Sequence, residues 1–168
     1  MKEIKLFITD IDGVWTDGSM YYSEEGYQMK KFHTYDSAGV LFLTLAGIPV
    51  AIVSGENSEA VRKRAAKLGI EEVHTGIQDK VALIEQLLSK YNLSWEETAY
   101  IGDDLNDIKV LQKAGLTACP SQSADYIKKL TDWPLTKKGG EGVFREFVEK
   151  YLKEKGIFED ILNNYLKG

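Results

Sequence analysis

The chain turns from apolar to acidic in one short stretch, which reads Phe7-Ile8-Thr9-Asp10-Ile11-Asp12-Gly13-Val14-Trp15-Thr16-Asp17. Its apolar half predicts a buried strand. Because alternate side chains of a strand share a face, Asp10 and Asp12 both lean beyond its carboxyl end, where open α/β sheets bind ligands. Two adjacent carboxylates repel each other unless a cation or a shared proton relieves the repulsion. The stretch therefore predicts a divalent metal site, a proton-transfer role, or both.

The length and composition indicate one soluble globular domain. The 168 residues are 43% hydrophobic and 28% charged, and the single cysteine excludes an internal disulfide. The formal net charge of −5 argues against nucleic acid as a partner but permits a small anionic substrate. We expect a cytoplasmic protein without a membrane partner, because there is no signal-peptide pattern and no apolar run approaches roughly 20 residues.

Strand and helix patterns alternate along the chain. Short apolar runs predict four more strands, at residues 49–53, 73–76, 99–101 and 116–119, and helical patterns separate them. This alternation is typical of βαβ units, so we predict a three-layer α/β/α, Rossmann-like domain with a mostly parallel five-stranded sheet. The single domain covers residues 1–168, with a β-hairpin flap at about 14–34 and a C-terminal helix and tail at about 140–168.

The hairpin is rich in large apolar side chains. It carries Met20, Tyr21, Tyr22, Tyr27, Met29 and Phe32 around a turn at Gly26. An isolated two-stranded ribbon is only marginally stable in water, so we predict that this one packs against a second copy of the chain. The tail after Gly156 repeats apolar pairs and is also expected to seek a partner surface, its own body or a neighbour's.

The polar residues at the predicted strand ends supply every part that phosphoryl transfer needs. Asp10 is a possible nucleophile, and Asp12, kept protonated by crowding, is a possible proton donor to the leaving alcohol. The phosphate oxygens would be held by three groups, Ser54, the amides around Gly55, and Lys80. Asp10 and Asp103 would hold Mg²⁺.

These residues resemble the four motifs of the haloacid dehalogenase phosphatase superfamily. The motifs are Asp10-Ile-Asp12-Gly-Val-Trp-Thr-Asp17, Ser54-Gly55, Lys80, and Gly102-Asp103-Asp104-Leu-Asn-Asp107. The resemblance implies that Asp10 is the nucleophile and that Asp12 is the general acid/base, whose backbone carbonyl also reaches Mg²⁺. It further implies that Asp103 is the third metal contact and that Ser54, Gly55 and Lys80 bind phosphate. Asp107, with Asp104 beside it, would support the metal waters or Lys80.

A narrower resemblance concerns the substrate. The gaps between motifs leave no room for a large cap, and the hairpin together with Thr136-Lys-Lys-Gly-Gly-Glu-Gly-Val-Phe-Arg145-Glu146 is similar to the 3-deoxy-D-manno-octulosonate 8-phosphate phosphatases. That family forms tetramers whose subunits cover one another's sites. Glu56, Arg64 and Lys67 resemble the branch acting on 2-keto-3-deoxynononate 9-phosphate, whereas octulosonate enzymes tend to carry Arg in place of Glu56. Glu56 would accept hydrogen bonds from sugar hydroxyls, and Arg64 and Lys67 would meet the sugar carboxylate.

Other interpretations stay open at this point. Octulosonate 8-phosphate and N-acetylneuraminate 9-phosphate are alternative substrates, and a non-catalytic binding relative is the alternative from another class. An EF-hand is disfavoured because Val14 and Trp15 stand where an oxygen ligand and a glycine are needed. A receiver domain is disfavoured because the third strand ends in His74-Thr75-Gly76 rather than in an acceptor aspartate.

Overall fold

The structure is a computed structural model that describes residues 2–26 and 28–167. Its strands are β1 (Leu6–Thr9), β2 (Tyr21–Tyr22), β3 (Gln28–Met29), β4 (Val50–Ser54), β5 (Glu72–Thr75), β6 (Thr98–Ile101), β7 (Leu116–Cys119) and β8 (Trp133–Pro134). Its helices are α1 (Asp36–Leu45), α2 (Glu59–Lys67), α3 (Lys80–Tyr91), α4 (Ile108–Leu111), α5 (Asp125–Lys128), α6 (Val143–Glu154) and α7 (Phe158–Lys167), with 3₁₀ turns η1 (Trp95–Glu97) and η2 (Leu105–Asp107).

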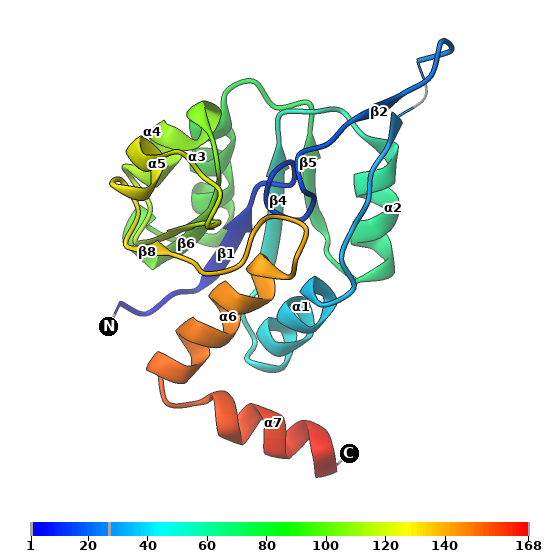
Figure 1. Cartoon of the computed structure of the whole chain (residues 1–168). Coiled ribbons are helices and arrows are strands. Elements are labelled where there is room, and N and C mark those ends of the chain that lie inside the picture. Colours follow the sequence, from blue (N-terminus) through cyan, green and yellow to red (C-terminus); the bar gives the residue numbers. More distant parts are fainter. Residues whose placement is uncertain (1, 27, 168) are drawn as a thin grey trace.

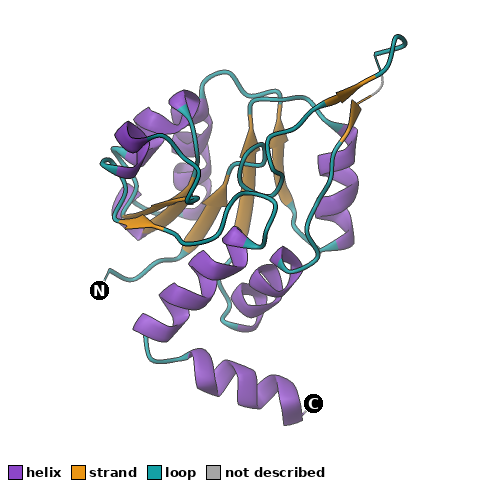
Figure 2. Ribbon diagram, viewed as in Figure 1, coloured by secondary structure: helices purple, strands orange, loops and turns teal. Residues whose placement is uncertain are grey.

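A parallel sheet forms the middle layer, in the order β5-β4-β1-β6-β7-β8. The alternation along β1 sends Phe7 to one core and Leu6 and Ile8 to the other. Helices α1, α2 and α6 cover the first face, and α3, α4 and α5 cover the second (Figures 1 and 2). The predicted three-layer α/β/α fold without a large cap is confirmed.

The sheet has one strand more than the five predicted. The additional strand, β8, pairs Trp133 with Ala118 of β7 at the edge of the sheet. It is two residues long and contains Pro134, which an edge position tolerates because one side of the strand needs no donor. A strand this short carries no alternating pattern, so the sequence gives no signal for it.

The hairpin β2-β3 is separate from the main sheet and projects from the body (Figure 1). Met20, Tyr21, Tyr22 and Met29 are exposed, whereas Phe32 packs against the main core. Tyr27, which we also predicted to be part of this apolar surface, lies outside the described residues. None of the helices in the described ranges combines the length and apolar character that a membrane span requires.

The C-terminal tail forms α7, which docks on the body through its first half. Phe158 and Ile161 are buried, and the Phe158 ring lies 5.3 Å from that of Phe42 in α1. Tyr165 and Leu166 at its far end are exposed. The first half of the tail thus packs against the body of the same chain, and its far end, with Tyr165 and Leu166, stays exposed.

Asp36 joins α1 to α6 and does not cap its own helix. Tyr35 occupies the N-cap of α1, and the fully buried Asp36 accepts a hydrogen bond of 3.2 Å from the Arg145 amide in the first turn of α6. An acceptor there satisfies an otherwise unpaired amide. Burial raises the pKa of Asp36 to about 6, although the amides of Arg145 and Phe144 act to lower it.

This raised pKa predicts an unusual pH dependence of stability. The fold favours the protonated carboxyl more than the unfolded chain does, so the contribution of Asp36 is complete below about pH 4 and is lost as the pH rises to about 6. The loss amounts to up to about 3 kcal/mol. We expect Asp36→Asn to flatten the slope of unfolding free energy against pH in this window, measured by urea denaturation.

The matched control is Asp125→Asn, because the Asp125 side chain is 91% exposed and the substitution makes the same change in charge. It should leave the slope unchanged. An unaltered slope in Asp36→Asn would contradict the assignment.

Candidate functional site

The site lies where the carboxyl ends of β1, β4 and β6 meet. Asp10 follows β1, Ser54 ends β4, and Asp103 follows β6 after Gly102. A cavity of about 340 Å³ opens there and is lined by Asp10, Asp12, Gly55, Glu56, Asp103 and Asp104, among others. The structure therefore brings the predicted strand-end residues together.

Asp10 is buried at the bottom of this cavity. Its side chain is 4% exposed, and its Oδ1 atom lies 3.1 Å from Nζ of Lys80 without forming a hydrogen bond within the described residues. Burial raises the pKa of Asp10 to about 7, and the nearby Asp107 carboxylate raises it further, while Lys80 acts to lower it. The carboxylate is thus short of stabilising partners and open to a cation or a substrate atom.

Lys80 is held by a buried network behind Asp10. Its Nζ donates to Oδ1 of Asp107 at 2.7 Å, and the Tyr100 hydroxyl also donates to that oxygen. The other oxygen of Asp107 accepts the amide hydrogens of Asp103 at 2.9 Å and Asp104 at 3.3 Å. Burial acts to lower the pKa of Lys80, but Asp10 and Asp107 outweigh it and the pKa is raised. Asp107 therefore fixes both the lysine and the loop after β6.

Three carboxylates, those of Asp10, Asp103 and Asp107, offer oxygens that lie within 4.8 Å of one another. Burial raises the pKa of Asp103 to about 8, and Asp10 and Asp107 add to the shift. Such a crowded acidic cluster, with Lys80 as its buried counterion, fits a hard divalent cation that takes oxygen ligands. The donor set agrees with the predicted ligands Asp10 and Asp103. Asp12 was predicted to contribute its backbone carbonyl, and its carboxylate lies outside this cluster.

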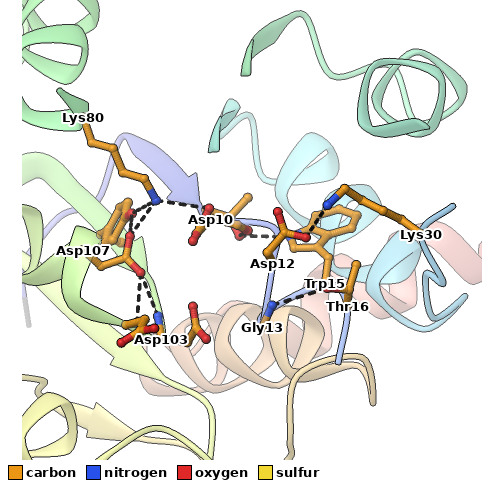
Figure 3. Close-up of polar contacts among 12 residues, drawn as sticks. Asp10, Asp12, Gly13, Trp15, Thr16, Lys30, Lys80, Asp103 and Asp107 are labelled. Atoms are coloured by element: carbon orange, nitrogen blue, oxygen red, sulfur yellow. Dashed lines mark hydrogen bonds and ion pairs between the residues drawn. The ribbon is translucent and has the colours of Figure 1, made fainter. Parts of the chain in front are cut away.

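Asp12 has a different environment from the one predicted. Other carboxylates lie close to Asp10 and Asp103, whereas the Asp12 carboxylate forms an ion pair with Lys30 (Figure 3). Asp10 and Asp12 line the same cavity, as predicted from the alternation, with Ile11 between them buried in the core, but their partners differ. The sequence pattern did not single out Lys30, which stands beside another lysine and outside the four motifs.

The loop that carries Asp12 is braced from two directions. Thr16 Oγ1 accepts from the Gly13 amide at 3.3 Å, and the Trp15 indole donates to Thr9 Oγ1 at 2.9 Å. From the other side, Gln122 donates to the Gly13 carbonyl at 2.8 Å and accepts from the Gly139 amide at 2.9 Å. A Cβ on Gly139 would lie 1.9 Å from the Gly13 carbonyl oxygen. Only glycine permits this approach, so the glycine-rich loop before α6 supports the acidic loop.

The predicted phosphate-binding residues lie beside Asp10. Ser54 is fully buried, and its Oγ atom has no hydrogen-bond partner in the described part of the chain. Gly55 lines the cavity, and a Cβ there would lie 3.6 Å from Nδ2 of Asn106. A buried hydroxyl with no hydrogen-bond partner among the described residues suits a ligand that accepts its hydrogen bond.

The three predicted specificity residues do not lie together. Glu56 lines the cavity. Arg64 donates to the Ser37 hydroxyl at 2.7 Å, across the contact between α2 and α1, and Lys67 is exposed at the last residue of α2. Neither basic residue is among those that line the cavity of its own chain. Their predicted contact with a sugar carboxylate stays a prediction.

The site has the order and geometry of the four motifs, and the comparison with known families agrees. The haloacid dehalogenase-like hydrolase family matches residues 30–115. The chain belongs to this family. Its curated relatives include the 3-deoxy-D-manno-octulosonate 8-phosphate phosphatase of Haemophilus influenzae, which is 36% identical over 100% of this chain and 94% of the relative.

Solved structures of haloacid dehalogenase-like hydrolases match over nearly the whole chain. A probable YrbI family phosphatase from Pseudomonas syringae superposes with a TM-score of 0.94 at 38% identity, covering 99% of this chain and 95% of the other. The 3-deoxy-D-manno-octulosonate 8-phosphate phosphatase from Moraxella catarrhalis, in complex with magnesium, phosphate and KDO, gives 0.93 at 35% identity over 98% and 94%. The chain is therefore an enzyme of a phosphatase family.

Proposed function

We propose that the chain is a Mg²⁺-dependent phosphomonoesterase that hydrolyses the phosphate of a 2-keto-3-deoxy sugar acid through a phosphoaspartate on Asp10. The observation that carries this proposal is the buried Asp10 carboxylate, which lies 3.1 Å from Lys80 Nζ and has an oxygen within 4.8 Å of one from each of Asp103 and Asp107. Carboxylates placed in this way act as nucleophiles toward phosphorus when the charge of the phosphoryl oxygens is neutralised.

Each predicted residue takes a part in this reaction. An oxygen of Asp10 attacks phosphorus, and the bond from phosphorus to the sugar oxygen breaks. Lys80, Ser54 and the amide of Gly55 hold the phosphoryl oxygens, a role supported by the burial of Lys80 and Ser54. In its protonated form, Asp12 gives a proton to the departing sugar oxygen, and the resulting carboxylate then takes one from the water that hydrolyses the phosphoaspartate.

Asp10, Asp103 and the backbone carbonyl of Asp12 are the proposed holders of Mg²⁺. The ion would neutralise charge on the phosphoryl group. Asp104 and Asp107 have supporting roles: Asp104 lines the cavity, and Asp107 ties Lys80 to the amides of the loop after β6. The acidic cluster described above is the observation that favours a divalent ion here.

We expect Asp10→Asn to abolish phosphate release, because an amide does not form the acyl phosphate bond. The loss should be at least about 1,000-fold in kcat, given the size of nucleophilic and electrostatic contributions. Chelation of Mg²⁺ should abolish wild-type activity, and added Mg²⁺ should restore it. The measurement is phosphate release from sugar acid phosphates.

Asp125→Asn is the control, since that side chain is exposed and is not among the residues that line the cavity. Absence of turnover of any phosphate ester by the wild-type enzyme would contradict the proposal and favour a non-catalytic binding module.

For the substrate we propose 2-keto-3-deoxynononate 9-phosphate. The support is Glu56, a carboxylate on the cavity wall that can accept hydrogen bonds from sugar hydroxyls. The curated relatives favour 3-deoxy-D-manno-octulosonate 8-phosphate as the second candidate, because that is the substrate in their names. N-acetylneuraminate 9-phosphate is a third candidate. Arg64 and Lys67 are proposed to contribute to recognition of the carboxylate in an assembly of several chains.

We expect Glu56→Arg to shift the preference toward the octulosonate. The ratio of kcat/KM for nononate over octulosonate phosphate should fall at least about tenfold, because the substitution removes an acceptor for hydroxyl groups. Glu71→Arg makes the same charge change at an exposed position outside the cavity and should leave the ratio unchanged. A wild-type preference for the octulosonate would contradict the role of Glu56.

We also propose a homotetramer in which the hairpin and the C-terminal region lie at subunit interfaces. The exposed Tyr21, Met29 and Leu166 support this arrangement, since water otherwise contacts these large apolar side chains. The cytoplasmic location expected from the sequence stays a prediction.

Paired substitution of Tyr21 and Met29, which face each other across the hairpin, tests the assembly. Tyr21→Ser with Met29→Ser should convert a tetramer to smaller species in analytical ultracentrifugation and lower the activity. Tyr126→Ser, at an equally exposed aromatic on α5, is the control. A fully active wild-type monomer at micromolar concentration would disprove the arrangement.

A further inference from the structure

The geometry points to Lys30 as a positioning residue that fixes the carboxylate of Asp12 for proton transfer to the leaving oxygen. This inference rests on the proposed function, because it assigns a supporting residue to the proposed general acid. Lys30 follows β3, on the arm by which the projecting hairpin returns to the body (Figure 1).

Lys30 is buried although the ribbon around it is exposed. Its side chain is 2% exposed, whereas the neighbouring Lys31 side chain is 62% exposed and Met29 is 51% exposed. An ammonium group is costly to bury unless an opposite charge and hydrogen bonds accompany it. The Lys30 ammonium forms an ion pair with Oδ1 of Asp12, and this oxygen also accepts a hydrogen bond from Lys30 Nζ. The burial of Lys30 is thus tied to the place of the Asp12 carboxylate.

The two lysines of the site act on different carboxylates. Figure 3 shows Lys30 reaching Asp12 from the side opposite Asp10 and Lys80. Asp12 lines the cavity, but Lys30 is not among its lining residues. Because the ammonium lies behind Asp12 and contacts Oδ1, the second oxygen of that carboxylate can face the leaving group.

This arrangement gives Lys30 a different role from that of a phosphate-binding lysine. Lys80 lies 3.1 Å from Asp10 and so is the cation next to the proposed nucleophile. Within the described part of the chain, the ion pair of Lys30 is with the proposed proton donor, Asp12. Loss of its contact should therefore slow reactions whose leaving group needs a proton and spare those whose leaving group does not.

Single-turnover kinetics with enzyme in excess and Mg²⁺ present test this distinction. The two substrates are 2-keto-3-deoxynononate 9-phosphate, whose alkoxide leaving group needs protonation, and p-nitrophenyl phosphate, whose phenolate does not. Lys30→Met keeps the length of the side chain and removes its charge. Lys30→Arg keeps the charge with a different head group, and Lys31→Met is the matched control on the same arm.

We expect Lys30→Met to slow release of the sugar acid about 10- to 100-fold, while release of p-nitrophenol changes by less than about threefold. KM for the sugar phosphate should change little. The rate of Lys30→Arg with the sugar phosphate should lie between the rates of Lys30→Met and wild type. If Lys30→Met does not unfold cooperatively, Lys30→Arg is used in its place for the same comparison of the two substrates. Lys31→Met should match wild type with both substrates.

Two outcomes would overturn the inference alone. In the first, the wild-type enzyme is active and both Lys30 variants have unchanged rates. In the second, the rates of the variants fall equally with both substrates, which indicates a purely structural role. A wild-type enzyme that hydrolyses neither substrate would instead overturn the proposed function, and the role of Lys30 with it.

Discussion

The concentration of buried negative charge at the end of β1 is the constraint on which the rest of the structure depends. Asp10, Asp103 and Asp107 bring carboxylate oxygens within 4.8 Å of one another, and Lys80 is the buried cation beside them. Burial and mutual repulsion raise the pKa values of Asp10 to about 7 and of Asp103 to about 8. A fold tolerates such a cluster when a ligand or cation compensates for its negative charge. The stability of this site and its chemistry therefore depend on the same electrostatic interactions.

The surrounding elements hold this charge in a fixed geometry. Asp107 accepts from Lys80 and from the amides of Asp103 and Asp104, so one carboxylate aligns a lysine and a loop. On the other side, Gln122 and the glycines before α6 press on the backbone of the acidic loop. The site is therefore built from the carboxyl ends of three strands and supported by segments more than a hundred residues away in sequence.

Much of this could be predicted from the sequence. The apolar run of β1 and the abrupt change at Asp10 predict a buried strand that ends at a ligand site, and the order of Asp10, Ser54, Lys80 and Asp103 predicts which residues meet. The remainder depends on contacts that no local pattern encodes. β8 is too short to show alternation. Asp36 accepts a hydrogen bond from the amide of Arg145, 109 residues further along the sequence. Lys30 has the sequence context of a surface lysine, and only the return of the hairpin to the body brings it to Asp12.

The central claim is that Asp10 becomes transiently esterified to phosphorus, and direct identification of the phosphorylated residue tests it. Enzyme quenched during turnover of a sugar acid phosphate and reduced with borohydride converts an aspartyl phosphate to homoserine, which mass spectrometry of proteolytic peptides locates. The account predicts homoserine at position 10, formed with Mg²⁺ and lost on chelation. Modification at another residue, or turnover that leaves residue 10 as aspartate throughout, would contradict it.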